Sequence, residues 1–158
     1  MLIRLRTSGQ VITESEFRNN NPNTSFPSIL TIDVLNSFDA DPVLSGPQPS
    51  HTLYQYVIQD GVEEINNQWF TKFVVVDMTN EQIDNLNIQL KESNKTQAIS
   101  LLAQTDWTEI SSVSDASKPT YLLNVQDFIN YRAQLRVIAI NPPVIVDNWP
   151  PKPTEQWK

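Results

Sequence analysis

Only a few residues in this sequence have the type that catalysis or metal binding requires, and their spacing argues against both. His51 is the single histidine, and no Ser, Asp or Glu arrangement near it marks a general base. Asp39 and Asp41 alternate as in some calcium loops, but the further oxygen ligands and the loop glycine are missing. Glu63 and Glu64 adjoin in an expected strand, where neighbouring side chains point to opposite faces. The sequence therefore predicts no catalytic residue, no metal site and no cofactor.

The composition excludes several further classes of function. The 158 residues contain no cysteine, which excludes disulfides and thiol catalysis, and only three glycines, too few for a glycine-rich phosphate loop. The net charge of −7, with the 11 Lys and Arg residues scattered, disfavours nucleic acids and anionic membranes as partners. No signal peptide is expected, and no apolar run approaches the roughly 20 residues of a membrane span. We expect a protein that is made in a cytoplasm and acts on other proteins.

Short strands and short helices alternate in the first 50 residues. Strands are expected at residues 2–5 and 11–12, and loops at 19–27 and 39–49. Thr13 and Glu16 have the spacing of a capping box and predict a brief helix. Thr31 predicts the start of a second one, whose buried face would hold Val34, Leu35 and Phe38.

Residues 53–78 give the clearest β signal, because aromatic and β-branched side chains are dense there. Three antiparallel strands are expected, at 53–58, 62–65 and 69–76, with turns at Asp60-Gly61 and Asn66-Asn67. The two short helices are expected to back this meander. The aromatic residues Tyr54, Tyr56, Trp69, Phe70 and Phe73 have two interpretations. They fill one face of the sheet as core, or they cover both faces, one of which meets a partner.

The composition changes at Asp77, and helical periodicity follows. Thr79 and Gln82 predict a capping box that opens a long helix, whose apolar stripes are separated by the polar segment 91–97. A second amphipathic helix is expected from Asn124 to about residue 140, before two prolines. The predicted fold class is α+β, with a small antiparallel β-meander head and short helices, then a helical hairpin and an extended Pro-rich C-terminus. The expected domains are the head at 1–78, the hairpin at 79–140 and a Pro/Trp tail at 141–158.

Three motifs of the C-terminal half resemble the tail assembly chaperone family of tailed bacteriophages. They are residues 101–108 (LLAQTDWT), residues 131–136 (YRAQLR), and Trp149-Pro150 followed by Lys152-Pro153. Together they lie within residues 101–153, about a third of the chain. Residues 13–18, 23–27 and 61–65 resemble a β-rich head that precedes this module in some phage tail proteins.

The resemblance implies a non-enzymatic phage tail protein, a structural adaptor or a fibre- or baseplate-associated component of the virion. It would be made in the cytoplasm of the host bacterium and would bind other phage tail, fibre or baseplate proteins, in an oligomer or a large assembly. The alternative that the resemblance leaves open is a tail or tail-fibre assembly chaperone, which dissociates and is not retained in the virion.

The matched residues also have a physical interpretation. If the hairpin closes, Asp106 is expected to pair with Arg132 or Arg136, with Trp107 packed on the arginine. Such a pair either only holds the two helices together or forms a site that recognises a partner. The stiff Pro-rich end is expected to dock onto another protein. The candidate partner-binding residues are Asp106, Trp107, Tyr131, Arg132, Arg136, Trp149, Pro150 and Trp157.

Overall fold

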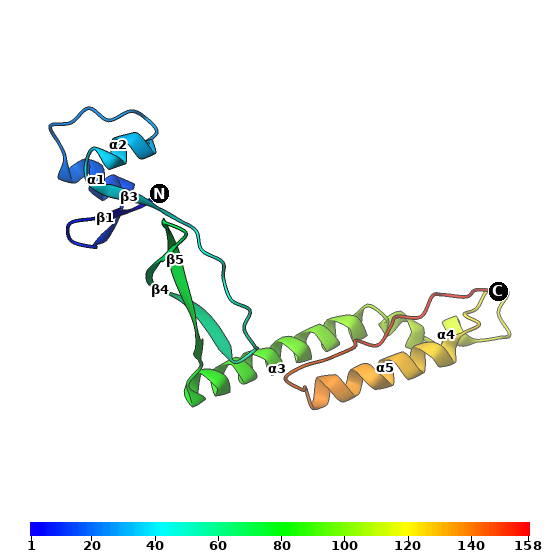
Figure 1. Cartoon of the computed structure of the whole chain (residues 1–158). Helices are drawn as coiled ribbons and strands as arrows, with labels where there is room; N and C mark the ends of the chain where they lie inside the picture. Colours follow the sequence, from blue (N-terminus) through cyan, green and yellow to red (C-terminus); the bar gives the residue numbers. More distant parts are fainter. The chain divides into compact units, whose positions relative to one another are not determined.

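The computed structural model describes residues 1–158 and has an α+β fold (Figure 1). The chain divides into two compact units, Met1–Met78 and Thr79–Lys158. None of its helices is long and apolar enough to cross a membrane. The elements of unit 1 are β1 (Leu2–Leu5), β2 (Val11–Thr13), α1 (Glu14–Asn20), α2 (Ile32–Asn36), β3 (Ala40–Leu44), β4 (Gln55–Ile65) and β5 (Gln68–Asp77). Those of unit 2 are α3 (Asn80–Ala103), the 3-10 helix η1 (Asp106–Glu109), α4 (Ser111–Ser114) and α5 (Val125–Ile140).

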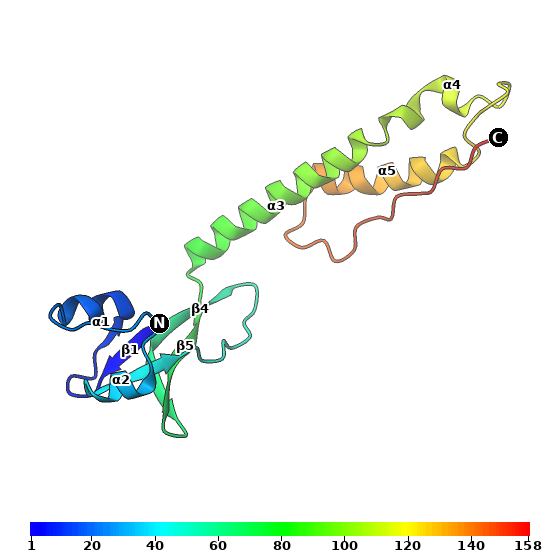
Figure 2. The same cartoon turned by 90° about the horizontal axis from the view of Figure 1, so that it is seen from above.

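The core of unit 1 lies between its two short helices and the first three strands. Both helices begin as the sequence predicts: the Thr13 hydroxyl accepts from the Glu16 N–H at 3.2 Å, and that of Thr31 from the Val34 N–H at 3.4 Å. Figure 2 shows α1 and α2 beside β1. The buried side chains of this core are Ile3, Ile12, Phe17, Leu30, Leu35 and Ala40. The ring centroids of Phe26 and Phe38 lie 5.5 and 5.7 Å from that of Phe17 and 5.3 Å from each other.

The second predicted loop is wrong in its first part, because Ala40–Leu44 forms β3, a central strand of the sheet. The proline within it led to the error, since proline has no N–H to donate to a ladder. The Arg6 N–H donates to the Asp39 carbonyl at 2.8 Å. This bond shows which residue pairs of the antiparallel β1–β3 ladder are hydrogen-bonded and which are not, because the two kinds alternate along the strands. By that alternation Pro42 occupies a non-hydrogen-bonded position, so its missing N–H costs this ladder nothing. Parallel pairing with β5 begins only at Val43.

The predicted three-stranded meander is also wrong, because residues 55–77 form a hairpin of two long strands. The sheet has five strands in the order β2-β1-β3-β5-β4, and β3 and β5 are parallel. Asp60-Gly61 is a bulge inside β4, where two residues stand opposite one of β5, and Gly61 has φ +77°. A glycine with positive φ serves a bulge as well as a turn. Asn66 and Asn67, with φ of 50° and 60°, form the predicted turn.

The β4–β5 hairpin therefore extends beyond the part of the sheet that the helices cover. Of its residues only Thr71 is buried, and the rest are half-buried or exposed. The aromatic residues of this region do not belong to the buried core: Tyr56 is 36% exposed, and Tyr54, Trp69, Phe70 and Phe73 are half-buried. The expectation that the short helices back these strands is wrong, since those helices pack on β1, β2 and β3.

In unit 2, α3 and α5 run antiparallel and side by side (Figures 1 and 2). The Asn94 side chain, in the polar segment of α3, donates to the carbonyls of Pro143 and Val144 at 2.9 and 3.2 Å. The other end of the pair is closed by Arg132, described below. The buried face of α5 holds Phe128, Tyr131, Arg132 and Leu135, and Ala98 is buried in α3.

The C-terminal segment, residues 141–158, packs on the rest of unit 2. It contains no helix, and its end pairs with residues 121–124: the Leu123 N–H donates to the Gln156 carbonyl at 2.7 Å, and the Lys158 N–H to the Tyr121 carbonyl at 3.0 Å. The Asn124 side chain bonds the same segment, donating to Thr154 O at 2.9 Å and accepting from the Gln156 N–H at 3.0 Å. Here the extended end is held by its own chain.

Gly46 provides a test of how the segment after β3 fits against β5. Its N–H donates to the Thr71 hydroxyl at 2.8 Å, and a Cβ at this position would overlap the main-chain carbonyl oxygen of Thr71. We predict that Gly46→Ala lowers the stability of unit 1 by about 3 kcal/mol, because a carbonyl in a sheet cannot turn away.

Gly9→Ala is the control. This glycine has φ +71° and open space around its Cβ position, so the cost is only that of the left-handed conformation, about 1 kcal/mol. Amide hydrogen exchange of β3 and β5 in the full chain measures both variants. Equal protection in the two would contradict the close contact at Gly46.

Candidate partner-binding site

Arg132 is the centre of a hydrogen-bond network at one end of the α3–α5 pair. This residue is only 5% exposed. Its Nη1 donates to the Leu102 carbonyl at 2.6 Å and to the Thr105 hydroxyl at 2.8 Å. Its Nη2 donates to Asp106 Oδ1 at 2.8 Å, and its Nε to Glu109 Oε1 at 2.9 Å. The guanidinium thus joins the end of α3, η1 and α5.

Local structure places each acceptor of this network. The main chain of α3 ends at Ala103, and the carbonyl of Leu102 accepts from the Thr105 N–H at 3.0 Å as well as from Arg132. Thr105 is fully buried, and its hydroxyl donates back to the Leu102 carbonyl at 3.0 Å. Asp106 and Glu109 stand three residues apart on the single turn of η1, which brings both carboxylates to the same side.

Of the two predicted pairings of Asp106, the structure forms the one with Arg132 at 2.8 Å. Arg136 pairs instead with Glu109, the same carboxylate that Arg132 Nε contacts. Sequence reasoning missed Glu109 and Thr105. A signal for Glu109 was present, because two arginines four residues apart need two acceptors, and Glu109 follows Asp106 at the spacing of one turn.

Trp107 packs on aromatic rings, whereas the sequence analysis expected it on an arginine. Its ring stacks on that of Trp157, with centroids 5.7 Å apart and an angle of 20°, and meets the edge of Phe128 at 5.7 Å. The end of the chain therefore covers η1. Trp157 remains 45% exposed, so the stack has a solvent-facing side.

The remaining candidate residues differ in accessibility. Tyr131 is buried, and burial raises the pKa of its phenol above the usual 10.0. Trp149 and Pro150 are half-buried in the C-terminal segment, and neither is among the hydrogen-bond partners of Arg132. The side chains of Asp106, Glu109 and Arg136 are 67%, 53% and 47% exposed. A partner could contact these three side chains and Trp157 directly. Arg132 and Tyr131 are buried, so they could only hold the exposed side chains in place.

Asp41, one of the two aspartates considered for a calcium loop, pairs with arginine. Asp41 accepts from Arg6 Nε and Nη2 at 2.8 and 2.7 Å, while Arg4 lies over the Trp69 ring at 3.8 Å. The Asp41 carboxylate therefore joins β3 to β1. No group of three or more His, Asp or Glu side chains gathers where it could hold a metal ion.

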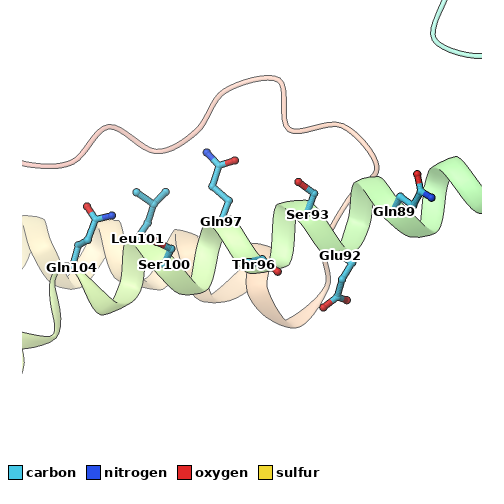
Figure 3. Close-up of a pocket in the computed structure, with 8 residues that line it drawn as sticks. All are labelled: Gln89, Glu92, Ser93, Thr96, Gln97, Ser100, Leu101 and Gln104. Atoms are coloured by element: carbon cyan, nitrogen blue, oxygen red, sulfur yellow. The ribbon is translucent and has the colours of Figure 1, made fainter.

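A shallow hollow of about 710 Å³ runs along α3, open to solvent. Figure 3 shows its side chains, with Gln97 and Leu101 pointing to the side along which the C-terminal segment passes. Its lining consists of amides and hydroxyls apart from one acid and one leucine: Gln89, Glu92, Ser93, Thr96, Gln97, Ser100, Leu101 and Gln104. These groups can donate and accept hydrogen bonds.

Comparison with known proteins gives no family: no family model matches this chain, and neither a curated protein nor a solved structure matches it.

The two arginines of α5 allow a matched test of the network. We predict that Arg132→Ala lowers the free energy of unfolding of unit 2 by about 1.5–3 kcal/mol, because buried hydrogen bonds from a charged donor are lost. Arg136→Ala should cost less than about 1 kcal/mol, since its pair with Glu109 is exposed.

Urea unfolding followed by circular dichroism at 222 nm measures both, because most of the helix lies in unit 2. If the two variants proved equally stable, Arg132 would not be the contact that closes the helix pair.

Proposed function

We propose that this chain is a non-enzymatic phage tail protein, a structural adaptor or fibre- or baseplate-associated component of the virion that acts through protein–protein contacts. The observation that supports this most is an exposed apolar stripe on α5, opposite its buried face. Ile129, Val137 and Ile140 are 48%, 67% and 84% exposed. With the exposed Ala133 they recur at steps of three or four residues, the spacing of one helix face.

The surroundings of this stripe fit a protein partner. The neighbouring side chains Gln126, Asn130 and Gln134 are exposed and uncharged. An apolar groove or helix of a partner could therefore cover them without burying an unpaired charge. Single exposed apolar residues are common on soluble proteins, but a continuous row of them is typical of an interaction surface. The exposed ion pair of Arg136 and Glu109 borders the stripe and would supply polar contacts at its edge.

The assignment to a phage tail rests on the resemblance of residues 101–153 to the tail assembly chaperone family. In this proposal residues 79–140 are the helical hairpin module of that family, and the Pro/Trp segment 141–158 closes it. Two of its three motifs meet in one network, since Asp106 belongs to the first and Arg132 and Arg136 to the second. The alternative within the same resemblance is a chaperone that uses the same surface and leaves before the virion is complete.

Retention in the particle distinguishes the two functions. We predict that purified virions contain this protein in stoichiometric amounts, because an adaptor must remain between the parts it joins. Quantitative mass spectrometry of the particles measures this. Its absence from virions, together with its presence in assembly intermediates, would favour the dissociating chaperone.

The stripe itself is tested by adding charge to it. We predict that Val137→Glu with Ile140→Glu reduces incorporation into tails at least about tenfold, since a charge buried against an apolar partner is costly. The fold should be unaffected because both side chains are exposed. Gln134→Glu is the control, as it adds a charge at an exposed position of the same helix outside the stripe. Normal incorporation of the double variant would exclude the stripe as the contact surface.

A further inference from the structure

Strand β4 ends the sheet, and its outer edge has no partner strand. The Met78 N–H donates to the Tyr54 carbonyl at 2.9 Å, which sets the alternation of the antiparallel β4–β5 ladder. Tyr56 and Ile58 therefore bond to β5 through their main chain, whereas the N–H and C=O groups of Gln55, Val57 and Gln59 point outward. Among these outward donors, the Gln55 N–H is bonded to Thr52 O at 3.2 Å.

This part of the edge lacks the features that usually prevent strands from pairing. Proteins protect exposed edges with charges, prolines or bulges. The segment from Gln55 to Gln59 has no charge and no proline, and the bulge of β4 lies beyond it at Asp60-Gly61. It is also the two-stranded end of the hairpin, since β3 pairs with β5 only at Trp69 and Phe70. A two-stranded ribbon is marginal by itself, so a further strand would stabilise it.

We propose that two copies of this chain pair through antiparallel β4 edges, with Val57 opposite Val57 of the second copy. In this register Gln55 stands opposite Gln59, so every outward-pointing residue of the segment meets an outward-pointing residue. A register shifted by two residues in either direction leaves Gln55 or Gln59 without an outward-pointing residue of the segment opposite it. Tyr56 then stands opposite Ile58, and the two exposed side chains, now 36% and 41% accessible, form an aromatic–aliphatic pair on one face.

The charges of β4 favour a second copy in this orientation. Asp60, Glu63 and Glu64 all follow the paired segment, so an antiparallel arrangement separates the acidic ends of the two copies. A parallel arrangement would place like charges side by side, which is unfavourable. The pairing uses unit 1 alone and goes beyond the proposed function, because it does not involve the stripe on α5.

The test uses the symmetry of the pair. The full chain is expected to sediment as a dimer, with twice the 18.0 kDa of one chain, in analytical ultracentrifugation over a range of concentrations. Val57→Lys and Val57→Glu should each raise the dimer Kd by about tenfold or more, because each places two like charges opposite one another. Mixing the two variants should restore a dimer, since the ammonium introduced in one copy then faces the carboxylate introduced in the other.

Val75→Lys is the matched control. Val75 is the cross-strand neighbour of Val57 on β5, on the same face and 37% exposed, so it adds the same charge away from the edge. This variant and the α5 double variant should both remain dimeric. A chain that is monomeric at all concentrations overturns the proposal, as does a dimer that survives Val57→Lys or variants that fail to combine. A monomer that binds an extended segment of another tail protein along β4 would also overturn it, in favour of a foreign strand.

Discussion

The arrangement of unit 2 depends on the burial of a single guanidinium. A buried arginine must have its donors satisfied, because an unpaired charge away from water is strongly unfavourable. Arg132 meets this requirement with two carboxylates, one hydroxyl and one main-chain carbonyl. These acceptors come from the end of α3 and from η1, so only one register of the two helices satisfies them all. The arginine is buried, while the carboxylates of Asp106 and Glu109 stay 67% and 53% exposed.

The same network explains why the C-terminal segment has a place to bind. By holding η1 against α5, Arg132 sets Trp107 beside Phe128 and leaves one face of its ring open. Trp157 stacks on that face, while the residues on either side of it, Gln156 and Lys158, form main-chain hydrogen bonds with Leu123 and Tyr121. A Pro-rich segment gives up little conformational freedom when it binds. Trp157, one of the candidate partner-binding residues, thus also makes contacts within its own unit.

Sequence reasoning succeeded where the cause of structure is local and failed where it is distant. The capping boxes at Thr13 and Thr79 involve residues three apart, and both form as predicted. The strand containing Pro42 was missed, because whether a proline is tolerated depends on which side of the strand faces β1. Asp60-Gly61 was taken for a turn since positive φ serves both turns and bulges, and only the partner strand decides. At the site, the Asp106–Arg132 pair was predicted as one of two options, whereas Glu109 was overlooked.

Each of the two units leaves part of its apolar surface exposed. In unit 1 the helices cover β1 to β3 and leave the hairpin half-exposed on both faces. In unit 2 the buried face of α5 is matched by an opposite face on which Val137 and Ile140 are largely exposed. While these side chains stay in water, the free energy of burying them is not gained. That free energy is roughly 25 cal/mol for each Å² that a partner could cover. A partner that covers this surface would recover that free energy on association.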